Sequence, residues 1–568
     1  MRILLLTHAF NSLTQRLFVV LQQDGHELSI EFDINDETTQ EAIDLFQPDL
    51  IVAPYLKRPI PDSIWQHHIC LIVHPGIVGD RGPSSLDWAI LNAETSWGVT
   101  VLQANAEMDA GDIWAVVEFP MRTASKASLY RHEVSTAAVQ AVQQAVVNFC
   151  TAGFQATALT QHALAARGQL RASMQQAVRQ IDWQHDDTAT VLRKINSGDG
   201  FPGVKDRLFG RDVFLYDAQE AFGMHGTAGE VIARSGLSLC RASKDGAVWI
   251  GHVKDKAHHH PFKLPATVLF ATESQALHDV PGLDGYQEIS YEQGGGVGYL
   301  YFPFYNGAMS SKQCQDLLAA YLEATQQDTR VIVLMGGTDF WSNGIHLNMI
   351  EAAKSPADES WANINAMDDL SEAIIRTTSH IVVSAMQGNA GAGGVFLARA
   401  ADQVWAYKQV ILNPHYKDMG NLYGSEYWTY LLPKYCGKEH AERITQARLP
   451  MGVSEAMDLG LLNAVIDGEK SYFVDAVKEK ATALAQQTNI HSLLQQKTMQ
   501  RERDEAVKSL ANYRAEELQR MKNNFYGFDP SYHVARYNFV YKVCKSRTPL
   551  TLAGHRSRQA LDLSRRAA

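Results

Sequence analysis

Cysteine is scarce in this sequence, and its spacing excludes several kinds of site. No Cys-x-x-Cys pair is present, so a zinc knuckle or a thioredoxin-like redox motif is not expected. Wide spacing also argues against a disulfide framework and favours reduced, buried thiols. The six cysteines are Cys70, Cys150, Cys240, Cys314, Cys436 and Cys544. We therefore expect no metal site and a reducing compartment.

Long apolar runs and an excess of positive charge are also missing. No run approaches the length of a membrane span, and Met1–Leu6 is too short for a signal peptide. Lysines and arginines number 51 against 62 aspartates and glutamates, which gives a net charge of −11 and argues against a nucleic-acid partner. The sequence predicts a cytoplasmic protein that acts on small molecules, without membrane or nucleic-acid binding.

The sequence does contain buried strand patterns that alternate with helical ones. Near the N-terminus this alternation predicts an α/β domain with a parallel sheet, over residues 1–165. Short β-type runs between residues 230 and 253 predict a small β-barrel within residues 166–275. A third domain is expected over residues 285–568, first with strands and helices and then, from residue 469, almost entirely helical. The stretch 161–180 is either helical or a connection.

A histidine at a strand end marks the first chemical centre. His74 follows the apolar run 69–73, and catalytic groups of parallel sheets lie beyond the carboxyl ends of strands. An aspartate nearby, such as Asp109, can orient the imidazole and raise its proton affinity for acid–base work. Taken alone, a capping histidine and a turn-forming aspartate would be the favoured explanation of these residues.

Four motifs around these residues resemble the tetrahydrofolate-dependent formyltransferases: VHPG, GPSSLDWAI, WGVTVLQ and EMDAGDI. The resemblance covers about residues 1–270 and includes the small C-terminal domain of that family. It implies that His74 and Asp109 are the catalytic pair and that N10-formyl-tetrahydrofolate is the formyl donor. Folate-binding residues implied in the same way are Leu56, Lys57, Arg58 and Asp109. Where the family has an asparagine two residues before the histidine, this chain has Ile72, so the formyl oxygen needs another donor.

Two glycine-rich turns follow later strands. Residues 336–346 (GGTDFWSNGIH) follow one strand and residues 388–397 (GNAGAGGVFL) follow another and open a helix. Two such turns can aim two backbone N–H groups at one oxygen. Neither a P-loop nor a correctly ordered G-x-G-x-x-G dinucleotide motif is present.

The two turns, with LPMGVSEAMDLGLLNAVID downstream, resemble the enoyl-CoA hydratase/isomerase (crotonase) family over about residues 296–467. The resemblance implies an oxyanion hole made by the N–H groups of Ile345 and Gly393, which binds the thioester carbonyl of a coenzyme A substrate. Coenzyme A-binding residues implied by it are Asn343, Gly344, Ile345, Gly393 and Gly394.

The two catalytic glutamates of the hydratases are absent. Phe396 occupies the first position and Tyr416 the second, so addition of water is not expected. Tyr416 and the later Glu426 are the candidate catalytic groups that remain. A tyrosine packed on the loop and a glutamate at a helix start are the structural alternatives.

As a whole the chain is similar to the HoxX-type maturation factors of nickel–iron hydrogenases. That resemblance implies transfer of formyl to coenzyme A and decarbonylation of formyl-CoA, with carbon monoxide becoming a ligand of the hydrogenase iron. It also implies partners among hydrogenase maturation proteins or the hydrogenase large subunit. An enzyme that stops at formyl-CoA or releases formate, and a non-catalytic assembly partner, remain alternatives.

Two further segments have simple interpretations. Three consecutive histidines, His258 to His260, suggest a metal site, but adjacent histidines in a loop cannot all face one ion, and a solvated loop is favoured. Residues 508–522 mix charges at helical spacing, which predicts a solvated helix face.

Overall fold

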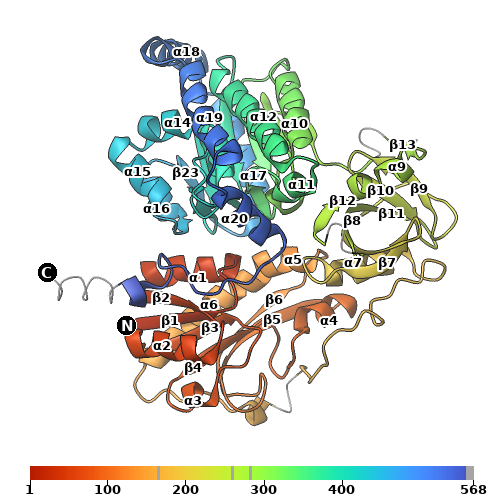
Figure 1. The fold of residues 1–568 in the computed structure, drawn as a ribbon, viewed down its shortest axis with the longest axis vertical. Coiled ribbons are helices and arrows are strands. Elements are labelled where there is room, and N and C mark those ends of the chain that lie inside the picture. Colours follow the sequence, from red (N-terminus) through yellow and green to blue (C-terminus); the bar gives the residue numbers. More distant parts are fainter. Residues whose placement is uncertain (163–166, 258–260, 281–284, 558–568) are drawn as a thin grey trace. The chain divides into compact units, whose positions relative to one another are not determined.

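The protein is seen here as a computed structural model that describes residues 1–162, 167–257, 261–280 and 285–557 (Figure 1). His258, His259 and His260 lie outside the described residues. The chain divides into two compact units, one made of residues 1–286 and 544–568 and the other of residues 287–543.

A six-stranded mixed sheet is the centre of the first unit. In the strand order β2-β1-β3-β4-β5-β6, neighbours from β2 to β4 pair in parallel, whereas the β4–β5 and β5–β6 pairs are antiparallel. The strands are β1 Arg2–Thr7, β2 Glu27–Phe32, β3 Leu50–Tyr55, β4 Cys70–His74, β5 Ser96–Gln103 and β6 Ile113–Pro120. The expected parallel sheet is thus confirmed for four strands. The antiparallel end formed by β5 and β6 was not predicted.

Helices cover both faces of this sheet (Figure 1). On one face α1 packs against α6, and apolar residues of α1 that recur at helical spacing, Leu13, Leu17 and Leu21, are buried. On the other face α2 buries Ile43 and Phe46 against strand residues. The helices of this region are α1 Ser12–Gln23, α2 Asp36–Phe46, α3 Asp62–Trp65, α4 Ser85–Leu91, α5 Lys126–Leu129 and α6 Ser135–Cys150.

The small β domain predicted around residues 230–253 is a seven-stranded sheet. Its strands follow the order β13-β9-β10-β11-β8-β7, with β12 paired to β11. They are β7 Val204–Leu208, β8 Arg211–Glu220, β9 Val231–Ser235, β10 Ser238–Ala242, β11 Ala247–Asp255, β12 Lys263–Pro265 and β13 His278–Asp279, with helices α7 Thr188–Gly198, α8 Ala266–Leu269 and α9 Ala271–Ser274. Residues 167–180 form a connection without a helix.

The second unit contains two sheets. The larger has the order β14-β15-β16-β18-β20-β23, and all its pairs except β14–β15 are parallel. Its strands are β14 Ser290–Gly294, β15 Val297–Tyr301, β16 Val331–Gly336, β18 Ile381–Met386, β20 Gln403–Tyr407 and β23 Ala464–Ile466. The smaller sheet has the order β17-β19-β21-β22, formed by β17 Phe340–Ser342, β19 Asn389–Gly391, β21 Ile411–Asn413 and β22 Met451–Gly452. Since β16 and β18 are buried along their whole length, they read as continuous apolar runs.

Helices enclose these sheets, and α19, Leu510–Tyr526, departs from the expectation of a solvated face. Residues 508–522 fall largely in α19, which packs on α12 and buries Leu510, Glu517, Met521 and Phe525. Glu516, Arg520 and Lys522 are exposed, whereas Lys508 and Arg514 are half-buried, so the expectation of a solvated face holds only in part. The helices are α10 Ser311–Ala324, α11 Leu347–Ala352, α12 Pro356–Arg376, α13 Gly393–Arg399, α14 Trp428–Tyr435, α15 Lys438–Gln446, α16 Val453–Asp458, α17 Phe473–Ala485, α18 Ile490–Val507, α19 Leu510–Tyr526 and α20 Ser531–Val540.

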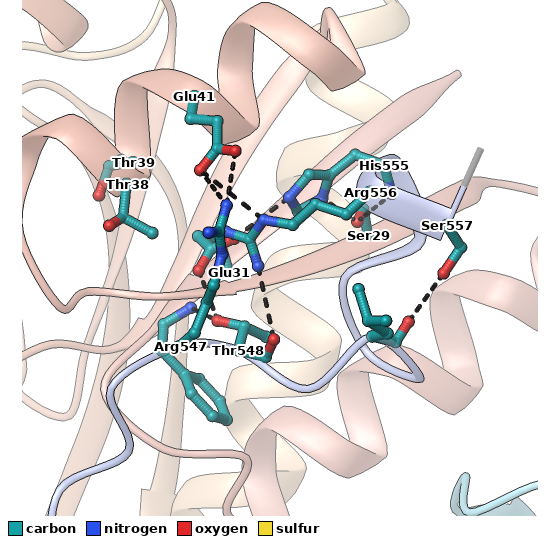
Figure 2. A network of polar contacts seen from close by, with 12 residues as sticks. Ser29, Glu31, Thr38, Thr39, Glu41, Arg547, Thr548, His555, Arg556 and Ser557 are labelled. Atoms are coloured by element: carbon teal, nitrogen blue, oxygen red, sulfur yellow. Dashed lines mark hydrogen bonds and ion pairs between the residues drawn. The ribbon is translucent and has the colours of Figure 1, made fainter. Parts of the chain in front are cut away.

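Residues 544–557 return to the first unit, whereas the sequence assigned them to the third domain. They lie along β2, the edge strand, where the Ile30 N–H donates to the carbonyl of Leu552 at 3.1 Å. Figure 2 shows the polar contacts that hold the segment. Buried Glu31 accepts hydrogen bonds at 2.5 Å from both the Thr548 hydroxyl and the Arg556 guanidinium. A polar tail segment has no sequence pattern that reveals its partner, so this pairing could not be predicted.

The cysteines are free thiols, as expected, but not all are buried. Cys150 and Cys544 are exposed, and the other four are buried.

Candidate functional site

The first centre lies at the carboxyl ends of neighbouring strands. His74 is the last residue of β4, and the loop with Leu56, Lys57 and Arg58 follows β3, which pairs with β4 in parallel. Because side chains alternate along a strand, Ile72 lies on the same face as His74. Its side chain has no hydrogen-bond donor, so the formyltransferase asparagine has no replacement at that position.

Two carboxylates flank the buried imidazole. Asp109 Oδ2 lies 3.5 Å from His74 Nδ1, and Asp80 Oδ2 lies 3.0 Å from Nε2. Asp109 is held in the left-handed backbone region, with φ 51°, and the Gly82 N–H donates to its Oδ2 at 3.1 Å. The expected pair His74–Asp109 is therefore close in space. Asp80 was missed, although its place in the loop after the histidine was visible in the sequence.

The expected folate-binding loop is held by acidic residues of the first unit. The Lys57 N–H donates to Asp33 Oδ2 at 3.3 Å, and the Arg58 guanidinium donates to Asp36 Oδ1 at 2.6 Å. Leu56 and Arg58 line a small pocket together with these aspartates. These contacts fix the loop beside the strand ends. Its role in folate binding stays a prediction.

The two glycine-rich turns of the second unit lie side by side. Strands β17 and β19 pair in parallel, with Ser342 opposite Ala390. A β-carbon on Gly344 would lie 3.4 Å from the Gly393 nitrogen, so the two loops are in van der Waals contact. Within the described part of the chain, the N–H groups of Ile345 and Gly393 donate to no hydrogen bond. Two unused donors on adjacent loops can bind one carbonyl oxygen.

The other residues expected to bind coenzyme A shape these loops. Asn343 donates its side-chain N–H to the carbonyl of Asn306 at 2.8 Å. A β-carbon on Gly394 would lie 2.1 Å from the carbonyl oxygen of Ser342, so glycine there allows the helix to approach the first loop. Their direct role in binding stays a prediction.

Tyr416 and Glu426 meet beside the loop that carries Gly393. The Tyr416 hydroxyl donates to Glu426 Oε2 at 2.5 Å, and its ring stacks on Phe396 with centroids 5.4 Å apart. A β-carbon on Gly393 would lie 2.1 Å from Glu426 Oε1. The carboxyl group is therefore directly against the backbone expected to bind the thioester. Phe396 is fully buried, so an apolar ring lies against Tyr416.

Two buried acids that the sequence analysis missed hold the turn that carries Glu426. Asp368 Oδ1 accepts the Glu426 N–H at 2.8 Å, and Glu517 Oε2 accepts the Tyr427 N–H at 2.9 Å. The Ser425 hydroxyl lies 2.8 Å from Asp368 Oδ2 and 3.2 Å from Glu517 Oε2. These bonds hold Glu426 and Tyr427 in the left-handed region, at φ 59° and 60°. An aspartate among the buried residues of α12 was the available signal for this cluster.

Burial shifts the protonation of this cluster. It raises the pKa of Glu426 to about 8, with the negative charge of Asp368 as the next cause. Burial likewise raises the pKa of Asp368 to about 7 and that of Glu517 to about 8. The pKa of Tyr416 is raised well above its usual value by burial and by the charge of Glu426. Glu426 is thus largely protonated at neutral pH, and Tyr416 is a hydrogen-bond donor.

Among the residues that the structure describes, no helix has the length and apolarity needed to cross a bilayer. No group of three or more histidine, cysteine, aspartate or glutamate side chains among these described residues is arranged to hold a metal ion.

Comparison with known proteins covers both centres. Residues 19–146 match the formyl transferase family model, and residues 299–528 match the enoyl-CoA hydratase/isomerase model. Methionyl-tRNA formyltransferase of Sulfurovum sp. is 24% identical over 239 residues, which cover 41% of this chain and 74% of that protein. Both matched families are enzyme families, which supports an enzyme.

Some of the similar proteins match nearly the whole chain. The hydrogenase maturation factor HoxX of Bradyrhizobium diazoefficiens is 57% identical over 560 residues, which cover 99% of this chain and 98% of that protein. The crystal structure of HypX from Aquifex aeolicus in complex with tetrahydrofolic acid has a TM-score of 0.94 at 44% identity, and the match covers 98% of this chain and 99% of that one. This chain therefore belongs to the HoxX/HypX family of hydrogenase maturation factors.

Proposed function

We propose that the chain transfers formyl from N10-formyl-tetrahydrofolate to coenzyme A at the first centre and releases carbon monoxide from formyl-CoA at the second. Tetrahydrofolic acid in the HypX structure, which is 44% identical over 98% of this chain, supports the choice of donor. The adjacent turns with two unused N–H groups support a thioester as the second substrate. Formyl-CoA connects the two centres as a shared intermediate.

At the first centre His74 acts as the general base. It takes the proton of the coenzyme A thiol, the sulfur attacks the formyl carbon, and the bond from that carbon to N10 breaks as N10 regains a proton. Asp109, 3.5 Å from the imidazole, borders the reacting groups. Since Ile72 supplies no donor, the formyl oxygen is stabilised by groups other than the family asparagine.

At the second centre the N–H groups of Ile345 and Gly393 bind the formyl oxygen. Glu426 removes the formyl proton, and the carbon–sulfur bond breaks. Tyr416 donates its hydroxyl proton to the sulfur and regains a proton from Glu426. Carbon monoxide and free coenzyme A are the products, so atoms and electrons balance. The contact between Tyr416 and Glu426 at 2.5 Å provides the path for that exchange.

The observation that carries this proposal is the position of the Tyr416–Glu426 pair. It lies against Gly393, while the position of one hydratase glutamate is taken by buried Phe396. An apolar wall excludes the ordered water that would convert formyl-CoA to formate. A proton acceptor next to a dry thioester site favours loss of carbon monoxide over hydration.

The test supplies formyl-CoA directly and measures carbon monoxide, trapped by haemoglobin, together with formate. Glu426→Gln keeps the shape and removes the charge, and Tyr416→Phe removes only the hydroxyl; both should lower carbon monoxide release by about 10²–10⁴-fold. Glu516→Gln, an exposed position on α19, is the matched control and should behave as the parent. Unchanged release in both site variants would refute the assignment.

The same assay separates the alternatives. Formate as the main product of the parent would identify a formyl-CoA hydrolase, and stable formyl-CoA would identify an enzyme that stops after the transfer. If neither half-reaction occurs and His74→Ala has no effect on hydrogenase maturation, the chain acts as an assembly partner. We further propose that the carbon monoxide becomes a ligand of the hydrogenase iron, with the hydrogenase large subunit or other maturation proteins as partners.

A further inference from the structure

Of the two carboxylates beside His74, the closer one is not the one that the formyltransferase motifs indicate. The Asp80 side chain is fully buried, and its Oδ2 lies 3.0 Å from Nε2. Asp109 lies 3.5 Å from Nδ1 and is partly exposed. The two aspartates therefore occupy opposite sides of the imidazole and have different surroundings, which suggests different roles.

The turn after β4 is shaped to allow the closer contact. The Asp80 N–H donates to the carbonyl of Ile77 at 2.9 Å, which folds the loop back toward His74. A β-carbon on Gly76 would lie 2.4 Å from His74 Nε2 and 2.6 Å from Asp80 Oδ2. Since both distances are far inside van der Waals contact, a side chain at residue 76 would displace the pair.

A cation compensates the buried charge of Asp80. Residues 168–171 run beside the loop, and the Gly168 N–H donates to the carbonyl of Val78 at 3.2 Å. This contact brings Arg171 Nε to 3.7 Å from Asp80 Oδ1. Within the described ranges neither of these two atoms has a hydrogen-bond partner, so the ion pair is their remaining polar interaction.

We propose that Asp80 is the positioning residue for His74. Its carboxylate accepts the Nε2–H, fixes that tautomer, and leaves the Nδ1 lone pair on the side of Asp109, where it takes the thiol proton. The inference rests on the formyl transfer proposed above. A buried carboxylate that holds one ring nitrogen so that the other can act as base is a general arrangement in acid–base catalysis. Asp109 then borders the substrates instead of orienting the ring.

The test compares Asp80→Asn with Asp109→Asn in the full-length protein. An asparagine amide keeps the shape of the side chain but can donate to Nε2, which would reverse the tautomer. We expect Asp80→Asn to lower kcat for transfer of formyl to coenzyme A by about 10²–10⁴-fold with tetrahydrofolate affinity unchanged. Nitrogen-15 NMR of labelled histidine, assigned by comparison with His74→Gln, should show Nε2–H in the parent and its loss in Asp80→Asn.

Double variants and a second perturbation distinguish the possible failures. In the His74→Ala background, Asp80→Asn should cost nothing more, because Asp80 acts through the imidazole. Normal kcat in Asp80→Asn, or a further additive loss in the double variant, would overturn the positioning role. Normal transfer in His74→Ala would overturn the proposed function instead. If Asp80→Asn does not fold, Gly76→Ala serves the same purpose, and a fully active Gly76→Ala would contradict the inference.

Discussion

Release of carbon monoxide from supplied formyl-CoA should increase with pH up to about 8. Glu426 can accept the formyl proton only as a carboxylate, and its pKa is raised to about 8 by burial and by the charge of Asp368. Two pH units below that value about 1% of the group is ionised, and one unit below it about a tenth. We therefore expect kcat at pH 6 to lie about 100-fold below its plateau, and kcat at pH 7 about 10-fold below it.

Asp368→Asn tests the cause of this raised pKa. Without the charge of Asp368, the pKa of Glu426 should fall, so the rising limb of the profile should move to lower pH. The raised pKa of Glu426 also makes the stability of the folded protein depend on pH. A carboxyl whose pKa is higher in the folded protein contributes most below its unfolded value of 4.5, and that contribution is lost as pH rises through about 8. Asp368→Asn should therefore lose less stability than the parent between pH 6 and pH 9.

The assay measures haemoglobin-trapped carbon monoxide at saturating formyl-CoA from pH 6 to pH 9, with Tm recorded at each pH to show that the protein remains folded. Glu426→Gln provides the baseline and should show no rising limb. A flat profile in the parent, or a rate that falls as pH rises toward 8, would refute the role of Glu426 as the base. An unmoved limb in Asp368→Asn would refute the electrostatic explanation.

Three further predictions concern other contacts. Gly393→Val should abolish carbon monoxide release from formyl-CoA, because even a β-carbon there would lie 2.1 Å from Glu426, while formyl transfer to coenzyme A, assayed separately, should persist. Phe396→Glu should divert product from carbon monoxide to formate by placing a water-binding carboxylate in the apolar wall, and a product ratio equal to that of the parent would contradict this role of Phe396. Arg556→Ala should lower the free energy of unfolding by about 3 kcal/mol, because the buried charge of Glu31 loses its guanidinium partner; denaturant titration measures the change, and a loss under about 0.5 kcal/mol would contradict it.

Much of the architecture could be predicted because buried strands and amphipathic helices have characteristic periods. The two glycine-rich turns were recognisable for the same reason, since each follows a continuous apolar run such as β16 or β18. Asp80 was missed because a single aspartate in a turn is most simply explained by loop geometry, and only the three-dimensional structure shows its contact with His74. Glu517 was missed because its helix carries many exposed charges. Isolated polar residues with long-range partners leave no periodic signal.

The segment 544–557 along β2 has a consequence for synthesis of the protein. The partners of buried Glu31 are encoded more than 500 residues later, so a nascent chain that has just left the ribosome with residues 1–286 has an open sheet edge. Residues 287–543 must be translated before the edge can be paired, which takes about 10–50 s at roughly 5–20 residues per second. During that time the exposed edge of β2 is a template for intermolecular pairing. Premature termination anywhere before residue 548 makes this exposure permanent, so truncated products should aggregate or require a chaperone.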